Sequence, residues 1–208
     1  MKRIFFLFML CSVLVSFDNS APKVLLVIKE GSSQLEYMLI NEVEKMSSVI
    51  KQSGFEVAIA TISGEVLNAG SVSVKPDLKL SEVKTKDYTG FIFPCMVLDL
   101  ATPEMIKIVK KAVDMGKPVA AQAGSLVILA KAGILKGKKY ALGSDPGTQS
   151  EATQLLFKGG IYSGTGVVQD GIIITSGTCP WIAKTSGRED GTVNLTQTLI
   201  ETIKTKTK

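Results

Sequence analysis

Apolar residues in this chain occur in short continuous runs that alternate with longer stretches of helical periodicity. The first run, residues 23–28, is apolar and β-branched, which is typical of a strand buried on both faces. After a glycine–serine turn at residues 31–33, an apolar stripe recurs at intervals of three and four: Leu35, Met38, Leu39, Val43, Met46, Val49 and Ile50. This spacing predicts an amphipathic helix that Gly54 ends, followed by a second strand over residues 55–60.

The alternation continues towards the C-terminus. Strands are predicted at residues 90–94, 119–121 and 172–174, with a weaker one at 72–74 inside the irregular stretch 61–89. Helices are predicted over three further segments: 102–116, 124–133 and 193–203. The first of these three begins with a threonine N-cap, a proline in the first turn and an acidic residue that favours the helix dipole.

Strands that alternate with helices predict βαβ units, and hence an α/β fold with a mainly parallel sheet covered on both faces. In such a sheet, ligands and chemistry gather at the carboxyl ends of the strands. The segments in which to look for a site are therefore those that follow the predicted strands: 29–36, 94–99, 122–125, 142–148 and 175–181.

The N-terminus has the form of a secretory signal. Lys2 and Arg3 precede an uncharged, mostly apolar run at residues 4–15, and a polar stretch follows. We expect residues 1–20 to be a signal peptide, residues 21–208 to form a single domain, and the protein to be secreted or periplasmic. A buried first strand is the alternative, and the run is shorter than a stable membrane span needs. A lipid anchor on Cys11 is not favoured, because the cysteine does not follow a small residue.

Composition removes several classes of function. The 208 residues include no histidine, which excludes Ser-His-Asp and Cys-His catalysis and histidine metal sites. Three cysteines are too few for a four-cysteine zinc site, and no metal site or cofactor is expected. The net charge of +5 is spread along the chain without a basic stripe or aromatic interleaving, so nucleic acid is not an expected partner.

Three stretches of the chain, residues 23–36, 118–133 and 159–176, resemble the family of PfpI-type intracellular proteases and Parkinson-disease deglycases. The last stretch is the most specific, because its glycines, tyrosine and Asp-Gly turn fall in the family's order. The resemblance extends from residue 23 to residue 203. It implies the flavodoxin-like three-layer sandwich of the class I glutamine-amidotransferase-like superfamily, and a homodimer, since relatives commonly self-associate.

The resemblance also implies that the family's catalytic groups are missing here. The family has a reactive cysteine on a sharp strand-to-helix turn, and the matching position is Gln122, whose amide is not a nucleophile. The family's histidine falls at about Gly143, and its glycine pair reads Cys95-Met96. The family's glutamate matches Glu36, which would carry a raised pKa and donate a hydrogen bond to Gln122. Alternatively, Glu36 is a solvated residue of a first helical turn, and Gln122 only satisfies buried backbone groups.

Cys95 and Cys179 are both expected just beyond carboxyl ends of strands, on the same rim as Gly124, Ser125 and Gly143. Export would place the two cysteines in an oxidising compartment, so a disulfide between them is one hypothesis. Two buried thiols that pack as small apolar groups are another. A relocated nucleophile at Cys95 is a third, weakened by the lack of a histidine to activate it.

Three functions are consistent with these features. The first is a non-catalytic or catalytically altered member of the family that binds a small ligand or a partner at the former active-site rim. The second is a hydrolase, protease-like or glyoxalase-like enzyme that uses Glu36 with Cys95. The third is a stress-related interaction protein in which the dimer matters more than the pocket.

Overall fold

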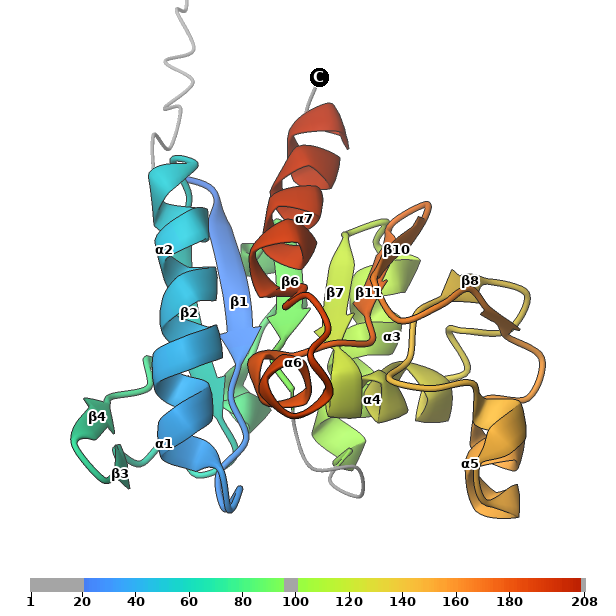
Figure 1. The fold of residues 1–208 in the computed structure, drawn as a ribbon. Coiled ribbons are helices and arrows are strands. Elements are labelled where there is room, and N and C mark those ends of the chain that lie inside the picture. Colours follow the sequence, from blue (N-terminus) through green and yellow to red (C-terminus); the bar gives the residue numbers. More distant parts are fainter. Residues whose placement is uncertain (1–20, 96–100, 207–208) are drawn as a thin grey trace, which may run out of the picture.

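The computed structural model describes residues 21–95 and 101–206, and its centre is a seven-stranded sheet (Figure 1). The predicted signal segment and Met96 lie outside the described residues. In spatial order the strands are β10 (Val167–Asp170), β11 (Ile173–Ser176), β7 (Val119–Gln122), β6 (Gly90–Phe93), β1 (Lys23–Val27), β2 (Glu56–Thr61) and β5 (Leu78–Lys79). All neighbours are parallel except β10 and β11, which form an antiparallel pair.

Helices cover both faces of the sheet (Figure 1). One face packs on α3 (Pro103–Asp114) and α4 (Leu126–Lys131). The other face packs on the π-helical segment η1 (Leu39–Val43), on α2 (Glu44–Gln52) and on α7 (Thr192–Lys206). A short helix, α1 (Leu35–Met38), leads directly into η1.

Strand β1 shows why both faces of the central sheet are apolar. Leu25 and Val27 pack on the side of α3 and α4, and Val24 and Leu26 pack on the side of α2 and α7. All four side chains are fully buried, as the continuous apolar run requires of a strand between two helical layers. The predicted flavodoxin-like α/β sandwich with a mainly parallel sheet is therefore confirmed.

Several short elements were not predicted by periodicity. In the stretch 61–89, the predicted strand at 72–74 is confirmed as β4 (Val72–Val74). The elements not predicted there are its hairpin partner β3 (Leu67–Ala69), the strand β5, and the 3-10 turns η2 (Leu80–Glu82) and η3 (Thr85–Asp87). The later additions are β8 (Lys139–Tyr140), η5 (Pro146–Thr148), α5 (Glu151–Leu156), β9 (Ile161–Tyr162), β10 and α6 (Pro180–Ser186). Each is at most seven residues long, which is too short for a hydrophobic period to appear.

The parallel register places the ends of three strands together. Phe93 at the end of β6 pairs with Ala121 in β7, and Gln122 at the end of β7 pairs with Ser176 at the end of β11. The segments that leave β6, β7 and β11 therefore start at the same edge of the sheet. Chain segments that are far apart in sequence meet there.

Candidate functional site

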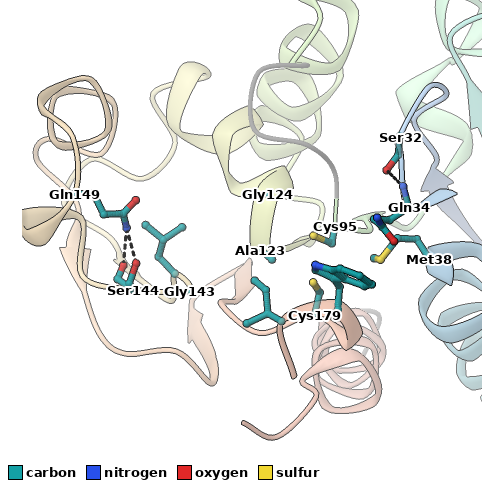
Figure 2. Close-up of a pocket in the computed structure, with 13 residues that line it drawn as sticks. Ser32, Gln34, Met38, Cys95, Ala123, Gly124, Gly143, Ser144, Gln149 and Cys179 are labelled. Carbon is teal, nitrogen blue, oxygen red and sulfur yellow. Dashed lines mark hydrogen bonds between the residues drawn. The ribbon is translucent and has the colours of Figure 1, made fainter. Parts of the chain in front are cut away.

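A cavity of about 490 Å³ lies at this carboxyl edge (Figure 2). Its wall combines the loop after β1, Cys95 after β6, the turn after β7, the loop after β8 and the first turn of α6. The predicted rim residues Cys95, Gly124, Gly143 and Cys179 all line it, and so does Ala123. The volume falls in the range typical of small-molecule sites.

Ala123 occupies the sharp turn between β7 and α4, as the first residue of the 3-10 turn η4 (Ala123–Ser125). Its φ is 45°, and among the described residues no other non-glycine residue has a positive φ. Such a conformation is costly for a residue with a Cβ and is found preferentially at functional sites. The residue at the sharp turn beside the cavity is thus Ala123, not Gln122. Its methyl group offers neither a nucleophile nor an acid.

Gln122 does not face the cavity. Its buried side-chain amide donates from Nε2 to the carbonyl oxygen of Thr178 at 2.8 Å and contacts the Thr192 hydroxyl at 3.1 Å. The Thr192 hydroxyl also lies 3.3 Å from Oε1 of Gln122. The assignment of Gln122 to the nucleophile position is therefore corrected by one residue, because the last residue of a strand and the first residue of its turn point to different sides.

Glu36 lies away from the cavity as well. It is exposed, and its Oε1 atom accepts hydrogen bonds from the backbone N–H and the hydroxyl of Ser71, at 2.9 and 3.0 Å. These bonds lower the pKa of Glu36, the opposite of the predicted shift. The predicted Glu36–Gln122 hydrogen bond is not formed, since Glu36 instead anchors the β3–β4 hairpin.

Glu42 is the acid that the site contains, and it was missed in the sequence. It lies in η1, is fully buried, and accepts a hydrogen bond on Oε1 from the backbone N–H of Cys95 at 2.7 Å. Within the described part of the chain, its Oε2 atom has no hydrogen-bond partner. Burial, and next the charge of Cys179, raise the pKa of Glu42 well above its ordinary value. The sequence feature that could have identified Glu42 is its position within the apolar stripe of the predicted helix, between Leu39 and Met46.

Cys95 and Cys179 are brought together as two free thiols that pack in one cluster with Met38 and Ala123. The predicted proximity is present, and both cysteines are free thiols in this structure. A disulfide between them stays a prediction. Cys179 is buried, whereas Cys95 is half-buried. Figure 2 shows both sulfurs at the cavity beside Met38 and Ala123.

The two thiols have opposite acidities. The hydrogen bond from Cys95, together with the backbone N–H groups of Ile182 and Trp181, lowers the pKa of Cys179 to about 7. Cys179 is the N-cap of α6, where Pro180 starts the helix and the first N–H groups are free to meet a thiolate. The hydrogen bond of Cys95 to Cys179, and next burial, raise the pKa of Cys95. The more acidic sulfur is therefore Cys179, not Cys95.

The remaining rim residues have structural roles. Ser125 is buried, and its hydroxyl lies 2.8 Å from the carbonyl oxygen of Phe93 and 3.1 Å from the backbone nitrogen of Gln122. It fixes the turn after β7 to the end of β6. Gly143 accepts a hydrogen bond on its carbonyl from Arg188, which holds the loop after β8 against the segment that follows α6.

An aromatic pair stands at the cavity wall. The rings of Tyr37 and Trp181 meet edge to face with centroids 5.5 Å apart, and the Lys184 ammonium lies 5.2 Å from the Tyr37 centroid. Trp181 also lines the cavity and is 37% exposed. Because it is the single tryptophan of the chain, its fluorescence reports on this site alone.

Comparison with known proteins identifies the class of this fold and site. Residues 22–183 match the model of the DJ-1/PfpI family. An uncharacterized protein of Methanocaldococcus jannaschii is 31% identical over 163 residues, which is 74% of each chain. The protein named deglycase PfpI of Pyrococcus furiosus is 31% identical over 116 residues, covering 50% of this chain and 68% of that one. The chain belongs to the DJ-1/PfpI family.

Solved structures agree with this assignment at the level of the fold. A ThiJ/PfpI domain protein of Brachyspira murdochii superposes with a TM-score of 0.68 at 16% identity, covering 89% of this chain and 98% of that chain. DJ-1beta of Drosophila melanogaster superposes with a TM-score of 0.63 at 20% identity, covering 89% and 95%. The resemblance inferred from the sequence is confirmed.

Proposed function

We propose that this protein binds a small, mostly apolar molecule in its cavity and does not perform cysteine chemistry at the strand-to-helix turn. The observation that carries this proposal is the alanine at position 123: the strained turn is kept, but its side chain is a methyl group. Loss of the attacking group removes most of the rate of a covalent enzyme. The pocket that such a turn serves is nevertheless present.

The cavity wall indicates what kind of molecule fits. Its apolar part is formed by Met38, Leu142 and Ile182, and polar groups are confined to a few positions. One of these is the pair Ser144 and Gln149, whose hydroxyl and amide lie 2.9 Å apart. An apolar wall with a few polar groups is the usual design of a site that binds by burial and orients by hydrogen bonds.

An enzyme of hydrolase or glyoxalase-like type is the second candidate function. It is favoured by the lowered pKa of Cys179, which supplies a nucleophile at neutral pH. In this candidate, Cys179 replaces Cys95, because the pKa of Cys179 is the lowered one. Glu42 replaces Glu36, because Glu42 bonds the backbone N–H of Cys95 whereas Glu36 bonds Ser71.

Ligand binding is tested by titration with the apolar dye 8-anilinonaphthalene-1-sulfonate. Binding is measured by the increase in dye emission and by the quenching of Trp181 fluorescence. We expect saturable binding at one site, weakened strongly by Ile182→Phe, which fills the cavity from α6. Ile40→Phe is the matched control, because Ile40 is exposed and does not line the cavity. Equal binding by both variants would contradict the proposal.

Catalysis is tested with deglycase, glyoxalase and peptidase assays on the purified chain. We expect no turnover above background, with the Pyrococcus furiosus deglycase as the positive control of the first assay. Turnover that Cys179→Ala abolishes would replace ligand binding by the second candidate function.

Two further parts of the proposal concern the whole protein. Export rests on the basic and apolar pattern of residues 1–20, and the homodimer rests on likeness to the family. Among residues 21–95 and 101–206, no helix has the length and apolar character to cross a bilayer. Cell fractionation of the full chain tests export, and light scattering tests the dimer. A dimer whose loss abolishes partner binding would favour the stress-related interaction protein.

A further inference from the structure

We propose that Cys95 and Cys179 form a redox pair that reduces hydroperoxides, with Cys179 as the attacking sulfur and Cys95 as the resolving sulfur. This activity is additional to ligand binding, and it needs no reactive group at the strand-to-helix turn. It assigns a chemical role to the two thiols that meet at the cavity.

The first argument is the position of the two sulfurs. Cys95 follows β6 and Cys179 follows β11, and the two strands are separated in the sheet by β7. Their side chains nevertheless pack in one cluster with Met38 and Ala123, and both line the cavity. Two free thiols in contact at a cavity can each reach the other without an opening of the fold. A substrate can reach both.

The second argument is the asymmetry between the thiols. Cys179 faces the backbone N–H groups of Trp181 and Ile182 and receives the hydrogen bond of Cys95, three interactions that favour its thiolate. The hydrogen bond to Cys179, and next burial, raise the pKa of Cys95 and so favour its protonated thiol. A reactive thiolate beside a protonated thiol is the arrangement that an attacking and a resolving cysteine require.

The third argument is the unpartnered oxygen of Glu42. This side chain is fully buried, holds the backbone of Cys95 through Oε1, and leaves Oε2 without a hydrogen bond among the described residues. A buried polar atom without a partner calls for an explanation. Because burial keeps this carboxyl protonated, and because it interacts electrostatically with Cys179, it is a proton source beside the reacting sulfur.

The chemistry balances with a hydroperoxide as the oxidant. The Cys179 thiolate attacks the terminal peroxide oxygen, so that an S–O bond forms and the O–O bond breaks, and the leaving oxygen takes the proton of the Glu42 carboxyl and departs as an alcohol. The Cys95 sulfur then attacks the resulting sulfenic acid, forming the disulfide and releasing water. In total the two sulfurs lose two electrons, the Cys95 thiol and Glu42 each give one proton, and the peroxide becomes alcohol and water; Glu42 then regains its proton from the solvent. An external dithiol restores both thiols by exchange.

The apolar cavity selects among hydroperoxides. Met38, Leu142 and Ile182 offer apolar contacts that hydrogen peroxide cannot use and that an organic hydroperoxide can. We therefore expect cumene hydroperoxide to react faster than hydrogen peroxide. The reverse order would place the reaction outside this cavity.

The test uses the full chain with Cys11→Ser, so that only the two cavity thiols remain. The reduced protein is mixed with one equivalent of cumene hydroperoxide, the reaction is followed by Trp181 fluorescence, and the product is identified by intact mass and peptide mapping. We expect consumption of one peroxide per protein and a Cys95–Cys179 disulfide that dithiothreitol reverses. No ligand is present, so the outcome is independent of the ligand-binding proposal.

Two variants separate the roles of the sulfurs. Cys95→Ser is expected to stop at a sulfenic acid on Cys179 that dimedone traps. Cys179→Ser is expected to slow peroxide consumption by roughly tenfold or more, because an ordinary thiol is only a few per cent ionised at neutral pH. Far-UV circular dichroism and thermal melting check that both variants are folded.

Three results would overturn the proposal: equal rates in the reduced chain and in Cys179→Ser, oxidation of Cys179 to a sulfinic acid while Cys95 stays reduced, or a sulfenic acid on Cys95. If Cys179→Ser fails to fold, the pH dependence of iodoacetamide alkylation at Cys179 in the unsubstituted site replaces it. A midpoint near the pKa of about 7 supports the attacking role, and a midpoint near that of a free thiol contradicts it.

Discussion

At the scale of single residues, the site depends on which of two neighbours faces the cavity. Gln122 ends β7 and turns inward to Thr178 and Thr192, while Ala123 adopts the left-handed backbone and lines the cavity. The difference arises because the chain reverses direction between the two residues. A functional assignment at this turn is therefore sensitive to a shift of one position.

This placement is tested with two cysteine substitutions in a background in which the three natural cysteines are replaced by serine. Ala123→Cys is expected to react readily with iodoacetamide, because position 123 lines the cavity. Gln122→Cys is the matched comparison and is expected to react slowly, because the Gln122 side chain is fully buried. Faster alkylation of Gln122→Cys would reverse the assignment of the turn.

At the scale of elements, the π-helical segment η1 carries the buried acid of the site. This segment continues α1 into α2 and buries Leu39, Glu42 and Val43 against the sheet. Short π segments within helices are frequent at functional sites. The free energy of burying Glu42 is lower for the neutral form, which makes the stability of this helix dependent on pH.

The sign of this dependence follows from the raised pKa of Glu42. The folded protein holds a proton that the unfolded chain releases near its ordinary value of 4.5, so the contribution is complete below that pH and is lost as the pH rises towards the folded pKa. From about pH 5 upwards, until the pH reaches the folded pKa, we expect the unfolding free energy to fall by up to about 1.4 kcal/mol per pH unit relative to Glu42→Gln.

Urea unfolding across this pH range measures the effect, and Glu36→Gln is the control. The pKa of Glu36 is lowered, so its contribution is present above its ordinary value and is lost as the pH falls through the folded pKa. Glu36→Gln is therefore expected to leave the slope above about pH 5 unchanged. If the unfolding free energy changed equally with pH in Glu42→Gln and in the unsubstituted protein, Glu42 would be ionised in the folded protein, which contradicts the prediction.

At the scale of the whole molecule, segments that are far apart in the sequence are tied to the same edge of the sheet, where the cavity lies. Gln122 in strand β7 contacts Thr178 before α6 and Thr192 at the start of α7. Thr192 in turn hydrogen-bonds Asp190 through its hydroxyl at 2.6 Å. This buried connection joins the C-terminal helix to the strand that carries the turn.

The contribution of the Gln122–Thr192 hydrogen bonds to the free energy of unfolding is tested by removing the Thr192 hydroxyl. Thr192→Val deletes the hydroxyl and leaves the buried Gln122 amide with fewer partners, which is expected to reduce the unfolding free energy by about 1–3 kcal/mol in urea titrations. Thr205→Val, at an exposed position of the same helix, is expected to change it by about 0.5 kcal/mol or less. Equal effects of the two substitutions would mean that the connection does not stabilise the fold.

The apolar pattern of the chain was sufficient to predict the layered α/β fold and the edge of the sheet at which the site lies. Periodicity works here because strands such as β1 are buried on both faces and helices such as α3 have one apolar face. The predicted strands also indicated that Cys95 and Cys179 lie close together, because each cysteine follows a strand of the same sheet. Periodicity did not identify Glu42, because the similarity to the family pointed to Glu36 in the same helical region.

Fold class, the position of the cavity at the strand ends and the absence of histidine follow from the order and composition of residues along the chain. Which acid is buried, which turn residue lines the cavity and which thiol is the more acidic follow from contacts between distant segments: Glu42 with Cys95, Gln122 with Thr192, and Cys179 with the first turn of α6. The physical reason is that periodicity depends on the average environment of a segment, whereas acidity and orientation depend on individual atoms a few ångströms away.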